Sequence, residues 1–111
     1  MRFATISVAL AALSSRALAA TCSYEEKEGM ASSYYISASG VPDIPGVCRG
    51  LWDNLKQFAD CIGVGSARCQ ADKNGNLDWG FTNGGSCNTG MVEATWWDAT
   101  KNKFGSIDCK E

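Results

Sequence analysis

The sequence predicts an α+β domain: a two-layer sandwich in which two helices cover one face of a four-stranded antiparallel sheet. Strand-like and helix-like segments alternate in the order β-α-β-β-α-β, and two split β-α-β halves of this kind make such a sheet. The six cysteines predict three disulfide crosslinks, because the core of so small a domain leaves little stability margin.

Residues 1–19 have the features of a cleavable secretory signal peptide. A basic start is followed by a short apolar stretch, and residues 17–19 (Ala-Leu-Ala) fit the small-x-small cleavage pattern. The stretch is shorter than the roughly 20 apolar residues that span a bilayer. We therefore expect a secreted, extracellular protein without a stable membrane anchor. Its single cysteine-rich domain comprises residues 20–111 and begins at Ala20 or, as the next choice, at Thr21.

The charge balance argues against nucleic acid as a partner. The chain has 10 Lys and Arg residues against 12 Asp and Glu residues. Cleavage after residue 19 removes Arg2 and Arg16, which leaves 8 bases against 12 acids and a net charge near −4. Binding to phosphates requires clustered cations, which this sequence lacks.

The domain begins with an expected lead-in and a first strand. Residues 20–31 are polar and acidic, so we expect a loosely ordered segment held by one disulfide through Cys22. From residue 33, aromatic and β-branched residues partly alternate with small ones, which predicts a strand that Gly40 and Pro42 end. One face of this strand carries Tyr34, Ile36 and Ala38.

Residues 47–59 predict an amphipathic helix, which Asp43 or the Pro45-Gly46 step could start. Its apolar positions recur at spacings of three and four: Cys48, Leu51, Leu55 and Phe58. The solvent-exposed face of this helix predicts two i,i+4 charge pairs: Arg49 with Asp53, and Lys56 with Asp60.

A β-hairpin is predicted around Asn74-Gly75, and the apolar faces select its register. A three-residue loop at residues 73–75 gathers apolar side chains on one side, whereas a two-residue loop sets Asp72 opposite Leu77. The pairs expected for the longer loop are Ala71 with Leu77, Cys69 with Trp79, and Ala67 with Phe81. This loop also places Gly75 at the left-handed position after a type I turn.

Residues 91–103 predict the second helix, with Asn88 or Thr89 as its N-cap. Its inward stripe comprises Val92, Thr95, Trp96 and Ala99. Residues 104–109 fit a short final strand.

Six cysteines allow 15 pairings, and the sequence rejects only one pair. Cys48 and Cys61 would lie about 20 Å apart if the residues between them were helical. We expect the bridges to tie the helices to the sheet and the lead-in to the body through Cys22, Cys48, Cys61, Cys69, Cys87 and Cys109.

Two helix segments carry a resemblance to known proteins. They are residues 48–55, which read Cys-Arg-Gly-Leu-Trp-Asp-Asn-Leu, and residues 91–105, which begin Met-Val-Glu-Ala-Thr-Trp-Trp. Together with the element order and the signal peptide, they resemble small cysteine-rich fungal secreted proteins. The architecture is similar to the killer-toxin-like α/β sandwich of smut-fungus killer toxins and related effectors. The resemblance is one of architecture, so no functional residue is carried over from it.

The sequence predicts neither an enzyme nor a metal or cofactor site. It has no histidine, which removes the commonest general base and the usual partner of a Ser or Cys nucleophile. Carboxylates such as Asp78 and Asp98 could serve a glycosidase, but scattered acids are expected at this charge content. Zinc would need histidines or a C-x2-C pair, and the segment from Asp72 lacks the Gly and Glu of a calcium loop.

Two aromatic residues are candidates for an interaction surface. Trp97 is rotated by about 100 degrees from the inward Trp96 along the second helix, on the face of Glu93, Thr100 and Lys101. Tyr35 points away from Tyr34 and faces solvent if the helices cover only one side of the sheet. The alternative for Trp97 is that it folds over the helix edge or under the loop at residues 82–90.

The leading functional hypothesis is a secreted fungal effector or killer-toxin-like protein that binds a host or competitor target, a protein or cell-surface component, without catalysis. A second hypothesis is a carbohydrate-binding module of the cell wall or apoplast, in which Trp97 and residues 82–90 bind a glycan. A third is an extracellular protease inhibitor that presents residues 82–90 as a disulfide-braced loop.

Overall fold

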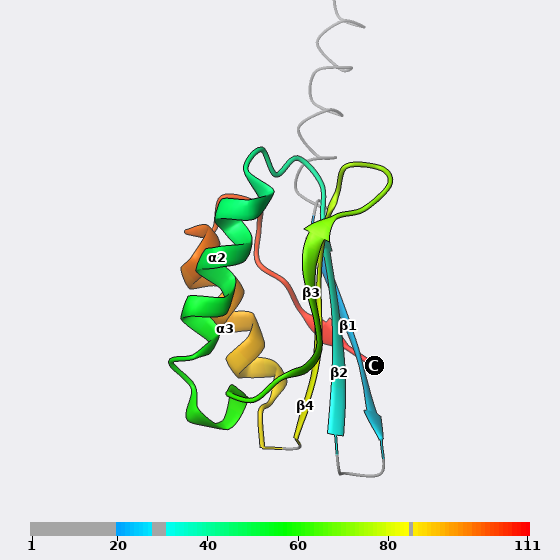
Figure 1. Cartoon of the computed structure of the whole chain (residues 1–111), viewed down its shortest axis with the longest axis vertical. Coiled ribbons are helices and arrows are strands. Elements are labelled where there is room, and N and C mark those ends of the chain that lie inside the picture. Colours follow the sequence, from blue (N-terminus) through cyan, green and yellow to red (C-terminus); the bar gives the residue numbers. More distant parts are fainter. Residues whose placement is uncertain (1–19, 28–30, 85) are drawn as a thin grey trace, which may run out of the picture.

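A computed structural model of the chain describes residues 20–27, 31–84 and 86–111 (Figure 1). The signal peptide predicted for residues 1–19 lies outside the described residues. The elements, in chain order, are β1 (Ala20–Lys27), β2 (Ala31–Ala38), α2 (Ile44–Leu55), the short 3-10 helix η1 (Ala59–Cys61), β3 (Gly65–Ala71), β4 (Leu77–Gly84), α3 (Thr89–Thr100) and β5 (Cys109–Lys110).

The described strands form one mixed sheet of five strands in the order β3-β4-β2-β1-β5. All neighbours are antiparallel except β1 and β5, which are parallel. Figure 1 shows both helices on the same side of this sheet, so the two-layer α+β class is confirmed. The predicted four-stranded, fully antiparallel sheet is wrong, because β1 adds a strand at the start of the chain and pairs with β5.

Strand β1 occupies the segment that we expected to be a loose lead-in. It pairs with β2 along its whole length, from Ala20 opposite Ala38 to Lys27 opposite Ala31. The polar composition of residues 20–27 did not indicate a strand. One face of β1 is exposed, and charged side chains are common near sheet edges. The inward face still contributes to the core, where the Tyr24 ring stacks on that of Tyr34 at 5.6 Å between centroids.

The last strand is shorter than predicted. Only Cys109 and Lys110 pair with β1, and residues 104–108 are not in a strand. The main-chain N–H of Cys109 donates instead to the Glu93 carboxylate of α3 at 2.9 Å. The C-terminal segment is thus held to the second helix as well as to the sheet.

The core lies between the helices and the inward face of the sheet. Aromatic rings fill its centre: Trp79 stacks with Trp96 of α3 at 6.4 Å and meets Trp52 of α2 edge to face at 6.0 Å. The two helices pack against each other, with Gly50 of α2 facing Ala99 of α3. The fully buried large side chains include Tyr34, Ile36, Leu51, Leu77, Trp79, Phe81, Val92 and Trp96.

Helix α2 begins earlier and ends earlier than predicted. Asp43 is its N-cap, as one of the two alternatives proposed, and its carboxylate accepts from the Gly46 N–H at 3.1 Å. The helix ends at Leu55 rather than at residue 59, since Phe58 is extended and turns the chain into η1. Neither predicted charge pair, Arg49 with Asp53 or Lys56 with Asp60, is among the ion pairs of the described residues.

The hairpin confirms the three-residue loop. The Asp72 N–H donates to the Asn76 carbonyl at 2.8 Å, Gly75 has a φ of 82°, and Cys69 lies opposite Trp79. The pair of Ala67 with Phe81 is wrong, because a β-bulge between residues 65 and 68 shifts the register there. As an edge strand, β3 also leaves Ala67 and Ala71 exposed.

Helix α3 confirms Asn88 as the N-cap, whose side chain accepts from the Met91 N–H at 2.9 Å. Of the predicted inward stripe, Val92, Thr95 and Trp96 are buried. The helix ends at Thr100 rather than at residue 103, since the next two residues, Lys101 and Asn102, adopt positive φ angles and reverse the chain.

Three disulfides join Cys22 to Cys109, Cys48 to Cys69, and Cys61 to Cys87. The pair rejected from the sequence, Cys48 with Cys61, is not formed. The bridges tie α2 to β3, β1 to β5, and η1 to the segment before α3. Within the part of the chain that the structure describes, no helix is long and apolar enough to cross a membrane.

Candidate interaction surfaces

The described residues expose three large hydrophobic side chains: Tyr35 at 39%, Trp97 at 49% and Ile62 at 61%. The sequence singled out the first two and missed the third. They lie in different places: Tyr35 is on β2, Trp97 is on α3, and Ile62 follows η1. The structure therefore offers separate surfaces rather than one site.

Trp97 lies on α3 with about half of its surface exposed, at 49%. Fewer polar side chains remain available beside Trp97 than the sequence predicted. Thr100, expected beside it, is buried and its hydroxyl donates to the Trp96 carbonyl at 2.7 Å. The carboxylate of Glu93, one turn earlier, accepts from the Cys109 N–H. Two of the polar side chains predicted beside Trp97, Glu93 and Thr100, are thus used in the fold, whereas Lys101 is exposed.

Tyr35 lies on the sheet face opposite the helices. Its neighbours on β2, Tyr34 and Ile36, are buried against the helices, and strand alternation points Tyr35 the other way. The strand pairing sets Gly80 of β4 beside it, and Arg68 of β3 lies opposite Gly80. The β3–β4 hairpin and the distant strand β2 therefore meet around this ring.

Arg68 lies over the sheet next to Tyr35. Its Cζ is 5.5 Å from the centroid of the Tyr35 ring, within the range of a cation–π contact. Its Nε donates to both carboxylate oxygens of Asp78, at 3.0 and 3.1 Å. The absence of a side chain at Gly80 makes this position possible, because a Cβ there would lie 2.5 Å from Arg68 Nη1. Glycine at residue 80 therefore leaves the space that the guanidinium occupies.

Two further contacts order this face. The Tyr35 hydroxyl donates to Glu25 Oε1 of β1 at 3.4 Å, and the hydroxyls of Ser33 and Thr82 lie 2.8 Å apart. We call Glu25, Tyr35, Arg68 and Asp78 the Tyr35 cluster. It combines one aromatic ring with two carboxylates and one guanidinium. Only Nε of Arg68 is engaged by Asp78, so among the described residues its Nη groups remain available to a ligand.

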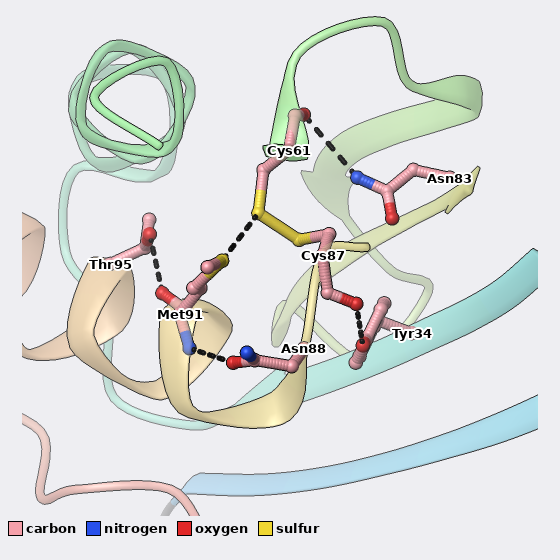
Figure 2. The surroundings of a disulfide bond; sticks show 7 residues. All are labelled: Tyr34, Cys61, Asn83, Cys87, Asn88, Met91 and Thr95. Carbon is pink, nitrogen blue, oxygen red and sulfur yellow. Dashed lines mark hydrogen bonds between the residues drawn. A yellow bond between two sulfur atoms is a disulfide. The ribbon is translucent and has the colours of Figure 1, made fainter. Parts of the chain in front are cut away.

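Tyr34 precedes Tyr35 on β2 but points to the inward face of the sheet, where it is buried. Burial raises the pKa of its phenol above 10.0, since the ionised form would lose its solvation. Its hydroxyl donates to the Cys87 carbonyl at 3.2 Å (Figure 2). The role of Tyr34 is therefore structural, and it holds β2 against the segment before α3.

The loop predicted at residues 82–90 is mostly part of regular structure. Strand β4 continues to Gly84 and α3 starts at Thr89. Figure 2 shows the region around the Cys61–Cys87 disulfide, where the Asn83 amide donates to the Cys61 carbonyl at 3.3 Å. The Met91 sulfur touches Cys61 Sγ at 3.7 Å, a van der Waals contact because a disulfide sulfur carries no proton. Among the described residues of this segment, only 86–88 lie outside β4 and α3, and the Cys61–Cys87 disulfide joins them to η1.

Ile62 is the functional candidate that the sequence reasoning missed. It borders an apolar pit of about 100 Å³ between the end of α2 and the start of β3, which is also lined by Trp52, Leu55 and Val64. The signal available in the sequence was an isolated branched apolar residue between Cys61 and Gly63, outside any amphipathic pattern. Only the packing of α2 beside η1 reveals the pit.

The described residues contain no group of three or more His, Cys, Asp or Glu side chains placed to hold a metal ion. The chain matches no known protein-family model, and no curated protein or solved structure is significantly similar to it.

Proposed function

We propose that this protein is a secreted effector or killer-toxin-like protein that binds a host or competitor target without catalysis, and that the Tyr35 cluster is its contact surface. The observation that carries the proposal is the ordered arrangement around Tyr35. An exposed aromatic ring is held between a guanidinium and a carboxylate on the sheet face that the helices leave open. Preordered Tyr and Arg side chains are the residues that most often dominate protein interfaces, because they lose little conformational freedom on binding.

The crosslinks support an extracellular role. All six cysteines are paired, and disulfides of this density persist in oxidising compartments. The signal peptide expected at residues 1–19 agrees with this setting. Crosslinks of this kind oppose unfolding, and a folded chain resists the extracellular proteases that a secreted toxin or effector meets.

The resemblance to killer-toxin-like fungal proteins is a further support. The succession of α2, the β3–β4 hairpin and α3 within a three-disulfide α+β domain keeps the expected architecture. The additional strand β1 and the mixed sheet depart from the expected order. The proposal therefore uses the resemblance for the class of protein and the Tyr35 cluster for the surface.

Cell binding by matched variants tests the proposed surface. The labelled protein is incubated with cells of candidate hosts and of competing microbes, and bound protein is compared for the native chain, Tyr35→Ser and Arg68→Gln. We expect both variants to lose binding while their unfolding curves stay close to the native one, since the altered side chains lie on the exposed face. Lys103→Ser, an exposed change beyond α3, is the control.

Trp97→Ser is the competing arm of the same experiment. If it abolishes binding while Tyr35→Ser leaves binding intact, the helix face is the contact and the proposed surface is wrong. If deletion of the gene changes neither colonisation of a host nor competition with neighbouring microbes, the effector and toxin proposal loses its support.

Carbohydrate binding is a second candidate for the same surface. Beside the Tyr35 ring lie a guanidinium, carboxylates and the Ser33 and Thr82 hydroxyls. Such groups hydrogen-bond to sugar hydroxyls, and an aromatic ring packs against the C–H face of a sugar. Retention on chitin, cellulose or β-glucan that Tyr35→Ser removes would favour this candidate, whereas no retention of the native protein on any of them would exclude those glycans.

A further inference from the structure

The sequence contains two Asn-Gly pairs, and the structure places them in opposite surroundings. Asn74 and Gly75 lie at the tip of the β3–β4 hairpin, where both are exposed. Asn83 and Gly84 lie at the end of β4, where Asn83 is only 5% exposed. The two pairs carry the same chemical groups, so a difference in their reactivity must come from the fold.

An asparagine followed by glycine can react with its own main chain. The nitrogen of the next residue attacks the side-chain amide, because the two groups close a five-membered ring. Glycine favours this step, since it has no side chain to hinder the approach. At Gly75 the space where a Cβ would lie is open, with no heavy atom beyond its chain neighbours within 4 Å. The hydrogen bonds of the loop are therefore what limits the attack there.

The hairpin loop holds the Gly75 nitrogen only weakly. The Gly75 N–H donates to the Asp72 carbonyl at 3.0 Å. The Asp72 carboxylate accepts from the N–H groups of Asn74 and Asn76, at 2.8 and 3.0 Å. These bonds must open before the nitrogen can react. They belong to an exposed three-residue loop, and such a loop opens locally at a small cost in free energy.

Asn83 is held far more firmly. Its amide donates to the Cys61 carbonyl at 3.3 Å (Figure 2), and its main chain pairs with Ser32 of β2. Both Cys61 and Ser32 are buried. Turning the Asn83 amide towards the Gly84 nitrogen would break this hydrogen bond and disturb the pairing of two central strands. Openings of that kind cost a large share of the free energy of global unfolding.

We propose that Asn74 is a site of spontaneous deamidation in the folded protein, and that the fold protects Asn83 from the same reaction. Hydroxide removes the Gly75 N–H proton, and the nitrogen attacks Asn74 Cγ. As the new N–Cγ bond forms, the Cγ–Nδ2 bond breaks, and Nδ2 leaves as ammonia with a proton taken from water. Water then opens the cyclic imide at either carbonyl carbon, which gives aspartate or isoaspartate at residue 74.

Both products add one negative charge at the tip of the hairpin, close to Asp72. Isoaspartate also lengthens the main chain, because the chain then runs through the former side-chain carbons. The loop closes with the Asp72 N–H bound to the Asn76 carbonyl at 2.8 Å, and a longer loop disturbs this bond. The isoaspartate form should therefore unfold at a lower urea concentration than the native chain.

Peptide mass spectrometry of the purified, disulfide-bonded protein tests the site. The protein is incubated at neutral to mildly basic pH and sampled over weeks, and a sample digested at the start sets the background. After reduction, trypsin and chymotrypsin separate the two asparagines, since Lys73, Trp79 and Phe81 provide cleavage sites. We expect deamidation at residue 74 to be at least about tenfold faster than at residue 83 in the folded protein.

The unfolded chain is the matched control. In protein that has been reduced, alkylated and held in guanidinium chloride, Asn74 and Asn83 should deamidate at similar rates, because only the fold distinguishes them. Asp72→Ala removes the acceptor that orders the loop, so it should raise the rate at Asn74 several fold. Asn74→Gln removes the site, since glutamine would have to close a larger ring. After incubation this variant should keep its urea midpoint, whereas the midpoint of the native protein falls. Circular dichroism checks that both variants fold.

An intact Asn74 in the folded protein, under conditions in which the unfolded chain deamidates there, would overturn the proposal. Equal rates at Asn74 and Asn83 in the folded protein would also overturn it, because the fold would then protect neither. If folded Asp72→Ala deamidates no faster than the native chain, opening of the loop does not control the reaction and the proposal fails.

Discussion

Two adjacent tryptophans in α3 should differ sharply in their contribution to stability. Trp96 is fully buried, stacks on Trp79 and donates its Nε1–H to the Gly105 carbonyl at 2.8 Å, whereas Trp97 is 49% exposed. Trp96→Ala should lower the free energy of unfolding by about 3–5 kcal/mol through the cavity and the lost contacts. It also leaves the Gly105 carbonyl without its donor, at a cost of about 1 kcal/mol.

Trp97→Ala should lower the same free energy by less than about 1 kcal/mol, because half of its side chain already contacts water. The gain in helix propensity from alanine is common to both variants, so it cancels in the comparison. A domain of this size has roughly 5–15 kcal/mol in total, so the Trp96 change removes a large share of it.

Urea denaturation followed by far-ultraviolet circular dichroism, with the disulfides intact, measures both variants by one signal. Trp96→Phe is the milder variant if Trp96→Ala does not fold, and it should lose about 1–2 kcal/mol by removing the indole N–H and part of the ring. Equal losses for Trp96→Ala and Trp97→Ala would refute the packing assigned to α3.

Two further predictions concern the crosslinks and a buried phenol. Replacing Cys22 and Cys109 by serine opens a loop of sequence separation 87, whereas replacing Cys48 and Cys69 opens one of 21. In the chain-entropy model these losses are about 4.5 and 3 kcal/mol, and urea unfolding that ranked them in the reverse order would contradict it. Because burial raises the pKa of Tyr34 above 10.0, its phenol contributes stability that is present below pH 10.0. As the pH rises further, the unfolded chain loses this proton before the folded one, so the melting temperature should fall, and Tyr34→Phe should remove that part of the fall.

Short-range patterns were the part of the fold that the sequence predicted well. The hairpin loop at residues 73–75 and the cap at Asn88 follow from hydrogen bonds within five residues, and the structure confirms both. The inward face of β2 follows from alternation, which depends only on the pleat of a strand. Each of these features is decided by neighbours in the sequence.

Strand β1 and the end of α2 were predicted wrongly because distant residues decide them. β1 is a strand since β2 supplies hydrogen-bonding partners along its length, and no local preference of residues 20–27 indicates this. The helix ends at Leu55 because the chain turns so that Cys61 reaches Cys87, 26 residues away. Tertiary pairing therefore overrides the pattern of charges that favoured a longer helix.

For the candidate surfaces too, the sequence determined the local features, and the tertiary structure determined those that depend on distant residues. The sequence alone determined that Tyr35 points away from the core and that Trp97 is rotated away from Trp96, because strand and helix geometry set the direction of neighbouring side chains. It also determined that the chain is a small crosslinked α+β domain. Only the tertiary structure decided what surrounds those side chains. Arg68 and Gly80 reach Tyr35 through the pairing of three strands, and the pit at Ile62 exists because α2 and β3 meet there. The physical reason is that direction is a local property of the backbone, whereas a binding surface is made by segments that fold together from far apart in the chain.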